Sequence, residues 1–185
     1  TAANRAHAAR LAREGFAGPL ALFQKYTAGL ASGGRTRYSF ERNGSVFICL
    51  DTSSGAIEPE QVKWLEEELE RAHEARHVFV AGHHPLLPVF EEGVVEGRDE
   101  TLALLKKHKV AAYLFGHCHD RSYRLEEGTL HVMGDCLCWD ERRGYWVVHV
   151  FADRILFGWK PLGPRAGMYP LYESVEVPEP RAAGR

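Results

Sequence analysis

The sequence predicts an α/β fold in which helices alternate with strands before a run of further strands. Two apolar segments, His77 to Ala81 and Val110 to Phe115, have strand character, and a helical segment lies between them. Each is followed by a glycine and then by histidines, in Gly82-His83-His84 and in Gly116-His117-Cys118-His119. In open α/β sheets ligands gather outside the carboxyl ends of the strands, so we expect both histidine groups on one rim.

The composition is that of an ordinary soluble globular protein. The chain has 185 residues, of which 45% are hydrophobic and 26% charged, and this length favours one domain. A net charge of −2 gives no bulk attraction to nucleic acid or to acidic membranes. No apolar run approaches the roughly 20 residues of a membrane span, and no secretion signal is recognised. We expect a cytoplasmic protein with no membrane partner and no strong nucleic-acid signal.

The cysteines do not suggest a disulfide framework. Cys136 and Cys138 are separated by one residue, which makes a bridge between them awkward, and no partner pair at zinc-site spacing accompanies them. Cys49 and Cys118 stand alone in the sequence. We expect all four to be buried, reduced thiols.

The first elements are expected to be two helices and a hairpin. Residues 2–14 are rich in Ala, Leu and Arg and end at a glycine, and residues 20–30 form a shorter helical segment. The period then changes to β-rich segments at 36–41 and 45–50. Asn43-Gly44 between them favours a tight turn, because both residues tolerate positive φ angles.

The clearest helix opens at Glu58-Pro59, since proline fits the first helical turn. Its apolar positions share one face and are Val62, Leu65, Leu69 and Ala72. The first histidine strand follows at 77–81. A loop then continues to Gly97, because its prolines and glycines argue against regular structure.

The second half begins with a helix at 100–109, for which Asp99 is the expected cap and in which Leu102 and Leu105 are expected to pack inward. The second histidine strand occupies 110–115. After it we expect consecutive antiparallel strands, at 121–125, 130–133, 145–151 and 154–159. The histidines inside these strands, His131 and His149, are expected to be structural. Residues 161–185 are rich in Pro, Gly and Arg, which predicts an extended or disordered tail.

The histidines at the strand ends are candidate metal ligands. Imidazole is the commonest protein ligand for metals near neutral pH. His117 and His119, one residue apart on a tight loop, can point at adjacent positions in space, and His83 arrives from the neighbouring strand. Hydrogen bonds that cap the loop are the structural alternative. His84 is a candidate contact for a substrate phosphate, or a supporting or exposed histidine.

At this point the chain resembles a known family. A strand followed by His-x-Pro, a helix, a strand followed by Gly-His-x-His and further strands resemble the C-terminal half of the calcineurin-like metallophosphoesterases, over residues 37–159. Cys49 to Thr52 and Glu60 to Leu65 resemble the Leu-Asp-Ser/Thr and Gln-x-x-Trp-Leu segments of the branch with cyclic-nucleotide phosphodiesterases and purple acid phosphatases. The resemblance implies a two-sheet β-sandwich flanked by helices in a four-layer α/β/β/α order.

The resemblance also implies an activity and its cofactors. His83 and His117 would bind one metal and His119 a second, the pair being divalent or mixed-valence ions of manganese, iron or zinc. A metal-bridging hydroxide would then hydrolyse phosphodiesters or phosphomonoesters, a nucleotide among them. Asp51 is not a metal ligand in the resembling family, so it is expected to cap its loop. Residues 86–98, directly after the first histidines, are the expected specificity loop.

The sequence departs from the family in its first half. The motifs Asp-x-His and Gly-Asn-His-Asp/Glu are absent, and Gly134-Asp135 comes after the last histidine loop. The expectation is therefore that residues 1–160 are the C-terminal portion of a metallophosphoesterase domain whose N-terminal half is missing, supplied in cis or in trans. Two alternatives stay open. One is a non-catalytic, truncated binding module, and the other is a single zinc site made of the three histidines.

Overall fold

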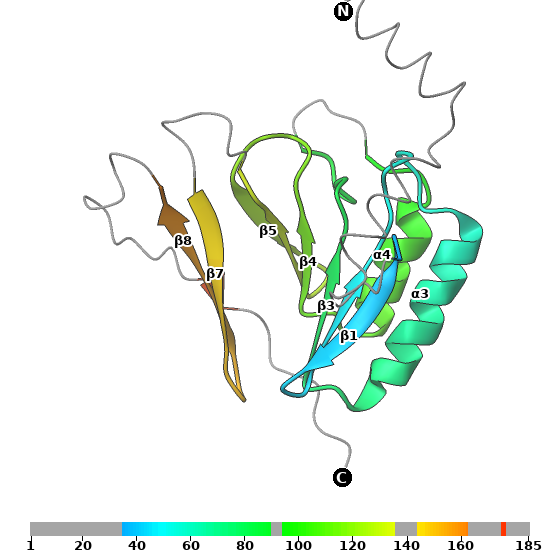
Figure 1. Ribbon diagram of the computed structural model, residues 1–185, viewed down its shortest axis with the longest axis horizontal. Helices are drawn as coiled ribbons and strands as arrows, with labels where there is room; N and C mark the ends of the chain where they lie inside the picture. The colour runs from blue at the N-terminus through cyan, green and yellow to red at the C-terminus, as the bar shows by residue number, and fades with distance from the viewer. Residues whose placement is uncertain (1–34, 90–93, 136–143, 163–174, 177–185) are drawn as a thin grey trace, which may run out of the picture. The chain divides into compact units, whose positions relative to one another are not determined.

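The computed structural model describes residues 35–89, 94–135, 144–162 and 175–176 (Figure 1). The helices expected at 2–14 and 20–30 lie outside this range, as do Cys136 and Cys138. The chain divides into two compact units, residues 1–38 and 39–185, and the second contains the elements that position the histidines.

A six-stranded sheet organises this unit, in the order β1-β2-β3-β4-β6-β5. Its strands are β1 (Tyr38–Arg42), β2 (Ser45–Cys49), β3 (His77–Ala81), β4 (Ala112–Phe115), β5 (Ser122–Glu126) and β6 (Thr129–Met133). The central strands β2, β3, β4 and β6 run parallel, and β5 is antiparallel to β6. The predicted bounds of the first histidine strand are confirmed.

The predicted turn between β1 and β2 is also confirmed. Asn43 and Gly44 have φ angles of 51° and 75°, and these two residues connect neighbouring strands. Positive φ at both positions is the requirement of the tight hairpin turn that Asn-Gly favours.

Two helices cover one face of the sheet, α3 (Pro59–Arg71), which continues into the short 3₁₀ helix η1 (Ala72–Glu74), and α4 (Arg98–Lys107) (Figure 1). The predicted apolar face of α3 is confirmed, since Leu65, Leu69 and Ala72 are buried and Val62 packs against the same core. Their partners on the sheet include Ile48, Val78, Val80 and Tyr113.

The predicted cap of α4 is wrong. The helix begins at Arg98, so that Asp99 lies in its first turn, and the residue before the helix is Gly97 with a left-handed φ of 75°. A side chain at Gly97 would place its Cβ 2.3 Å from the carbonyl oxygen of Ile57. This close approach fixes where the helix starts, and Asp99 instead contributes its negative charge to the helix N-terminus.

The second sheet contains β7 (Gly144–Val150), β8 (Ile155–Pro161) and β9 (Val175–Glu176), all antiparallel. It covers the face opposite the helices, because Ile155 and Phe157 of β8 are buried with Phe79, Leu130 and Val132 of the first sheet. The indole Nε1–H of Trp146 also donates to the Met133 carbonyl at 2.9 Å. The described residues therefore form three layers, helices, sheet and sheet (Figure 1).

The expected series of consecutive antiparallel strands is corrected by this topology. β5 with β6 and β7 with β8 are antiparallel pairs, but β6 lies parallel beside β4 and β7 begins the second sheet. The alternation of apolar residues predicts where each strand lies in the sequence. Which strand pairs with which depends on tertiary packing, and the alternation does not predict it. β9 lies inside the region expected to be an extended tail.

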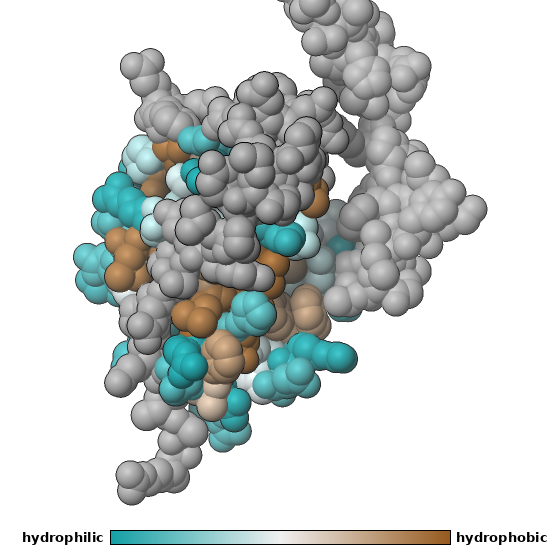
Figure 2. All heavy atoms as spheres, turned by 90° about the vertical axis from the view of Figure 1, so that its left-hand side faces the viewer, coloured by the Kyte–Doolittle hydropathy of each residue, from teal (hydrophilic) through white to brown (hydrophobic). Residues whose placement is uncertain are grey.

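Apolar side chains remain exposed on the second sheet. Tyr145, Val148 and Val150 of β7 and the adjacent Phe151 are all exposed. Figure 2 shows the molecule from the side of this sheet, with hydrophobic side chains among hydrophilic ones. Within the described ranges, no helix combines the length and apolarity needed to cross a membrane.

His131 is a buried polar residue in the middle of β6, between β4 and the edge strand β5. It is 2% exposed, its ring lies 5.7 Å from that of Tyr113, and its Nδ1 has no hydrogen-bond partner in the described part of the chain. Burial lowers the pKa of His131 to about 4, and the smaller effects of Glu126 and Arg124 oppose each other. His131 is therefore neutral in the folded protein near pH 7.

We predict that His131 makes the fold sensitive to acid. Its folded pKa of about 4 lies below the ordinary value of 6.5, so the unfolded chain binds the proton first and stability falls as the pH drops from 6.5 towards 4. The resulting loss in the free energy of unfolding amounts to about 2 kcal/mol between pH 7 and pH 5. Urea unfolding at both pH values should show a correspondingly smaller loss in His131→Leu.

The control for this experiment is His73→Leu, because the His73 side chain is 73% exposed. It should keep the acid sensitivity of the wild-type protein. An equal acid sensitivity in all three proteins would contradict the role assigned to His131.

Candidate metal centre

The histidine groups occupy two loops that stay side by side beyond the strand ends. β3 and β4 are parallel neighbours. Backbone pairing continues past them, because Gly82 N–H donates to the Leu114 carbonyl and Gly116 N–H donates to the His83 carbonyl, both at 3.0 Å. The loops therefore leave the same edge of the sheet, as expected from the sequence.

This pairing brings three imidazoles together. Nε2 of His83 lies 3.3 Å from Nδ1 of His117, and the two rings are close to perpendicular, with an interplanar angle of 82°. The ring of His84 lies 5.1 Å from that of His83 and 4.2 Å from that of His117, measured between centroids. The structure thus gathers His83, His84 and His117 into one cluster.

The second loop has an unusual backbone. His117 and His119 both have left-handed φ angles, 71° and 52°, and Cys118 N–H donates to the Gly116 carbonyl at 2.9 Å. A left-handed conformation costs a residue other than glycine about 1 kcal/mol or more, and such residues concentrate at functional sites. The tight loop thus holds the two histidines in a conformation that regular structure does not provide.

The surroundings of His83 favour its neutral form. Burial lowers the pKa of His83, and the nearby His84, His117 and His119 lower it further. A neutral imidazole has a free lone pair on one nitrogen, which is the form that binds a metal ion. His83 is therefore favoured in the form that can bind a metal cation.

The spacing of His83 and His117 fits joint coordination of one metal ion. Two imidazole nitrogens that each lie about 2.0–2.1 Å from a tetrahedral zinc ion are about 3.3–3.4 Å apart. The observed distance between His83 Nε2 and His117 Nδ1 is 3.3 Å. These two nitrogens need no large movement to bind the same ion.

His119 is exposed and contributes least to the lowered pKa of His83. Its ligand atoms do not join those of His83 and His117, because only one group of three in the described ranges has all its ligand atoms within 4.8 Å of one another, and that group lies elsewhere. One zinc ion bound by all three histidines would require His119 to move.

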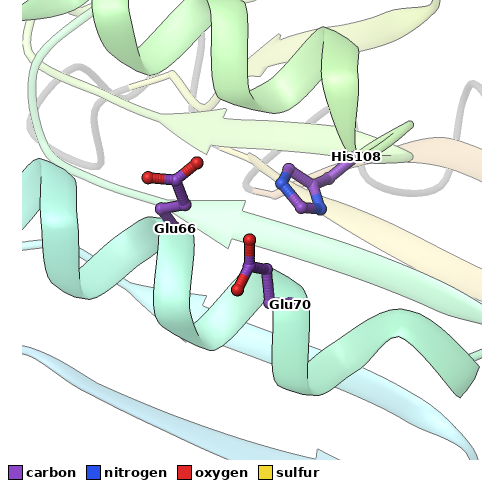
Figure 3. Close-up of side chains that lie close together, drawn as sticks. All are labelled: Glu66, Glu70 and His108. Carbon is purple, nitrogen blue, oxygen red and sulfur yellow. The ribbon is translucent and has the colours of Figure 1, made fainter.

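That other group consists of Glu66 and Glu70 of α3 and His108, which directly follows α4 (Figure 3). The ammonium of Lys107 already lies 2.8 Å from Oε1 of Glu66. This contact lowers the pKa of Glu66 and raises that of Lys107. An ion pair between the two helices therefore accounts for the position of Glu66 in this group. A metal ion would have to compete with Lys107 for the Glu66 carboxylate.

Thr52 and Tyr113 support the histidine loop, and sequence reasoning gave neither residue a role. Thr52 is buried, and its Oγ1 accepts the backbone N–H groups of His83 and His84 at 2.9 and 3.1 Å. The Tyr113 hydroxyl donates to the His84 carbonyl at 2.8 Å. In the sequence, Thr52 is marked only by its place soon after a predicted strand. The structure shows that this strand, β2, pairs with the first histidine strand, β3.

The expected capping role of Asp51 is confirmed. Its carboxylate accepts the Ser53 N–H at 3.0 Å and the Ser53 hydroxyl at 2.6 Å. The buried Gln61 fixes the backbone of Asp51, because its side-chain amide donates to the Asp51 carbonyl and accepts the Asp51 N–H, both at 2.7 Å. Helix α3 is thereby tied to the loop that carries Thr52.

The expected specificity loop, 86–98, is described only in part, because residues 90–93 lie outside the described ranges. Leu86 and Val95 are buried in the helix-side core, and Val95 N–H donates to the Pro85 carbonyl at 3.2 Å. The described ends of this loop are therefore anchored next to the first histidine group.

Comparison with known proteins gives a consistent family match. Residues 13–121 match the model of the calcineurin-like phosphoesterases. The chain is 38% identical over 76 residues to tartrate-resistant acid phosphatase type 5 of Sus scrofa, which is 40% of this chain and 22% of that protein. The Homo sapiens protein of the same name is 38% identical over 68 residues, 36% of this chain and 21% of that protein. The matched segment thus spans about a fifth of the length of these curated relatives.

Among solved structures, the fold is similar to GAP50, described as the anchor in the inner membrane complex of Plasmodium. The TM-score is 0.57 at 16% sequence identity, over 76% of this chain and 53% of that chain. At this identity the similarity concerns the fold alone.

We predict that His117→Ala weakens zinc binding by more than the roughly 10–100-fold that is typical for loss of an outer-shell partner, because His117 is an expected direct ligand. Equilibrium dialysis against Zn²⁺ measures the affinity. His108→Gln is the matched control from the Glu66 group and should bind zinc as the wild-type protein does. A larger loss in His108→Gln than in His117→Ala would place the principal site between the helices instead.

Proposed function

The chain belongs to the calcineurin-like phosphoesterase family, and we propose that it contributes His83, His117 and His119 to a metal centre that hydrolyses phosphate esters. The observation that carries this proposal is the 3.3 Å spacing of His83 Nε2 and His117 Nδ1. It occurs at the carboxyl edge of a parallel sheet, where α/β proteins bind their ligands.

Each histidine has a distinct part in the proposal. His83 and His117 hold one ion, and His119, which lies apart from them, holds a second. Bound metal ions supply Lewis acidity, which neutralises charge on phosphate oxygens and activates water near neutral pH. In this proposal His84, whose ring lies 4.2 Å from that of His117 between centroids, donates a hydrogen bond to a phosphate oxygen.

Other ligands complete the proposed centre. Imidazoles alone suit zinc, whereas added carboxylate and amide oxygens favour manganese, iron or mixed pairs. The sequence has no Asp-x-His or Gly-Asn-His-Asp/Glu motif. We therefore propose that a further segment, in cis or in trans, provides these oxygen ligands.

Two substrate classes are candidates. The curated relatives are named acid phosphatases, which favours phosphomonoesters, and a phosphodiester such as a cyclic nucleotide is the second candidate. The rival function is a non-catalytic binding module. GAP50 is described as an anchor, but its similarity concerns the fold and supports neither function. A measurement of ester hydrolysis therefore distinguishes a phosphoesterase from a binding module.

In the presence of the segment that supplies the oxygen ligands, the proposal predicts metal-dependent hydrolysis of p-nitrophenyl phosphate, bis(p-nitrophenyl) phosphate or both. Removing metal with a chelator should abolish turnover, and Mn²⁺, Fe²⁺ or Zn²⁺ should restore it. His119→Ala should lower both the metal content and kcat, the latter by about 100-fold or more, because a direct ligand is lost.

His149→Ala is the matched control, since His149 is an exposed histidine on β7, and it should retain metal content and turnover. Turnover that survives metal removal would refute the proposed chemistry. Stable metal binding with no hydrolysis of either ester would support the binding module.

A further inference from the structure

We propose that Thr52 is a positioning residue for the metal centre, whose hydroxyl holds the His83–His84 loop so that His83 stays opposite His117. The inference rests on the proposed function, because it assigns to Thr52 a part in the same site. Its basis is the network of hydrogen bonds and close contacts around a single buried hydroxyl.

The hydrogen-bonding capacity of Thr52 is fully directed at the histidine loop. A hydroxyl accepts two hydrogen bonds and donates one. The two accepted bonds come from the backbone N–H groups of His83 and His84, at 2.9 and 3.1 Å. The hydroxyl proton can be donated to Nδ1 of His84, 3.4 Å away, in the His84 tautomer that leaves this nitrogen unprotonated. Thr52 itself is 2% exposed, so water does not readily replace it.

The backbone of His83 connects Thr52 to the second histidine loop. Its N–H donates to Thr52 Oγ1, and its carbonyl accepts the N–H of Gly116, the residue before His117. A shift of the His83 peptide therefore acts at once on the loop that carries His117. The 3.3 Å spacing between the two imidazoles depends on this peptide.

Packing leaves the loop little room to adjust. A Cβ added at Gly82 would lie 2.5 Å from the Tyr113 hydroxyl oxygen and 3.2 Å from Cγ2 of Thr52, so the backbone at Gly82 is enclosed by both side chains. Tyr113 also holds the His84 carbonyl. Thr52 and Tyr113 thus both restrict the backbone at Gly82.

Removal of the hydroxyl alone separates positioning from packing. In Thr52→Val the shape is kept, but the part-buried N–H groups of His83 and His84 lose their acceptor, so the loop must shift towards another acceptor or towards water. Thr52→Ser keeps the acceptor and loses only a methyl group. Thr101→Val is the remote control, because Thr101 of α4 is also buried and its hydroxyl donates to a backbone carbonyl, that of Gly97 just before the helix.

The test compares the full-length protein with these three variants by Zn²⁺ affinity, by the ring ¹⁵N shifts of His83 and His117 without metal, and by p-nitrophenyl phosphate turnover. We expect Thr52→Val to bind Zn²⁺ about 10–100-fold more weakly, as for loss of an outer-shell partner, and to shift both rings. Thr52→Ser and Thr101→Val should stay within about threefold of wild type, well below that effect.

The outcomes distinguish this inference from the proposed function. If Thr52→Val matches Thr101→Val in affinity and in the ring shifts, the positioning role is refuted, whatever the turnover. If Thr52→Val alone loses affinity but the wild-type protein hydrolyses no ester, Thr52 keeps its role and the proposed function fails. If the wild-type protein binds none of Zn²⁺, Mn²⁺ and Fe²⁺, the proposed function fails and the ring shifts of the metal-free variants decide on Thr52.

Discussion

The parallel pairing of β3 and β4 is the constraint on which the rest of the site depends. Parallel strands end at the same edge of a sheet, and here the backbone ladder continues through Gly82 and Gly116 into the two histidine loops. Two glycines followed by histidines are therefore delivered to adjacent positions. The 3.3 Å spacing of the His83 and His117 nitrogens follows from this register.

The two cores keep this register fixed. Along β3, Val78 and Val80 face the helices, while Phe79 faces the second sheet, so the strand is buried on both sides as a central parallel strand requires. On the helix side, Gln61 ties α3 to the Asp51 backbone, and the next residue, Thr52, holds the histidine loop. These polar contacts connect the site to the helix layer.

Much of this arrangement could be predicted from the sequence, because local signals encode it. The apolar run at 77–81 gave the bounds of β3, and Pro59 marked the start of α3. The placement of β6 beside β4 could not be predicted, since strand periodicity does not name the neighbouring strand. The rim of histidines was predicted, with His84 in it, whereas the role of Thr52 depends on hydrogen bonds between segments distant in sequence, which no spacing along the chain reveals.

The central claim is that His83 and His117 bind the same metal ion. The most direct measurement is a Zn²⁺ titration of ¹⁵N-labelled protein followed through the histidine ring nitrogens. Joint coordination predicts that His83 Nε2 and His117 Nδ1 change together, at the same zinc equivalent, while His108 does not respond. A response of His108 before either of them, or of only one of the two, would contradict the claim.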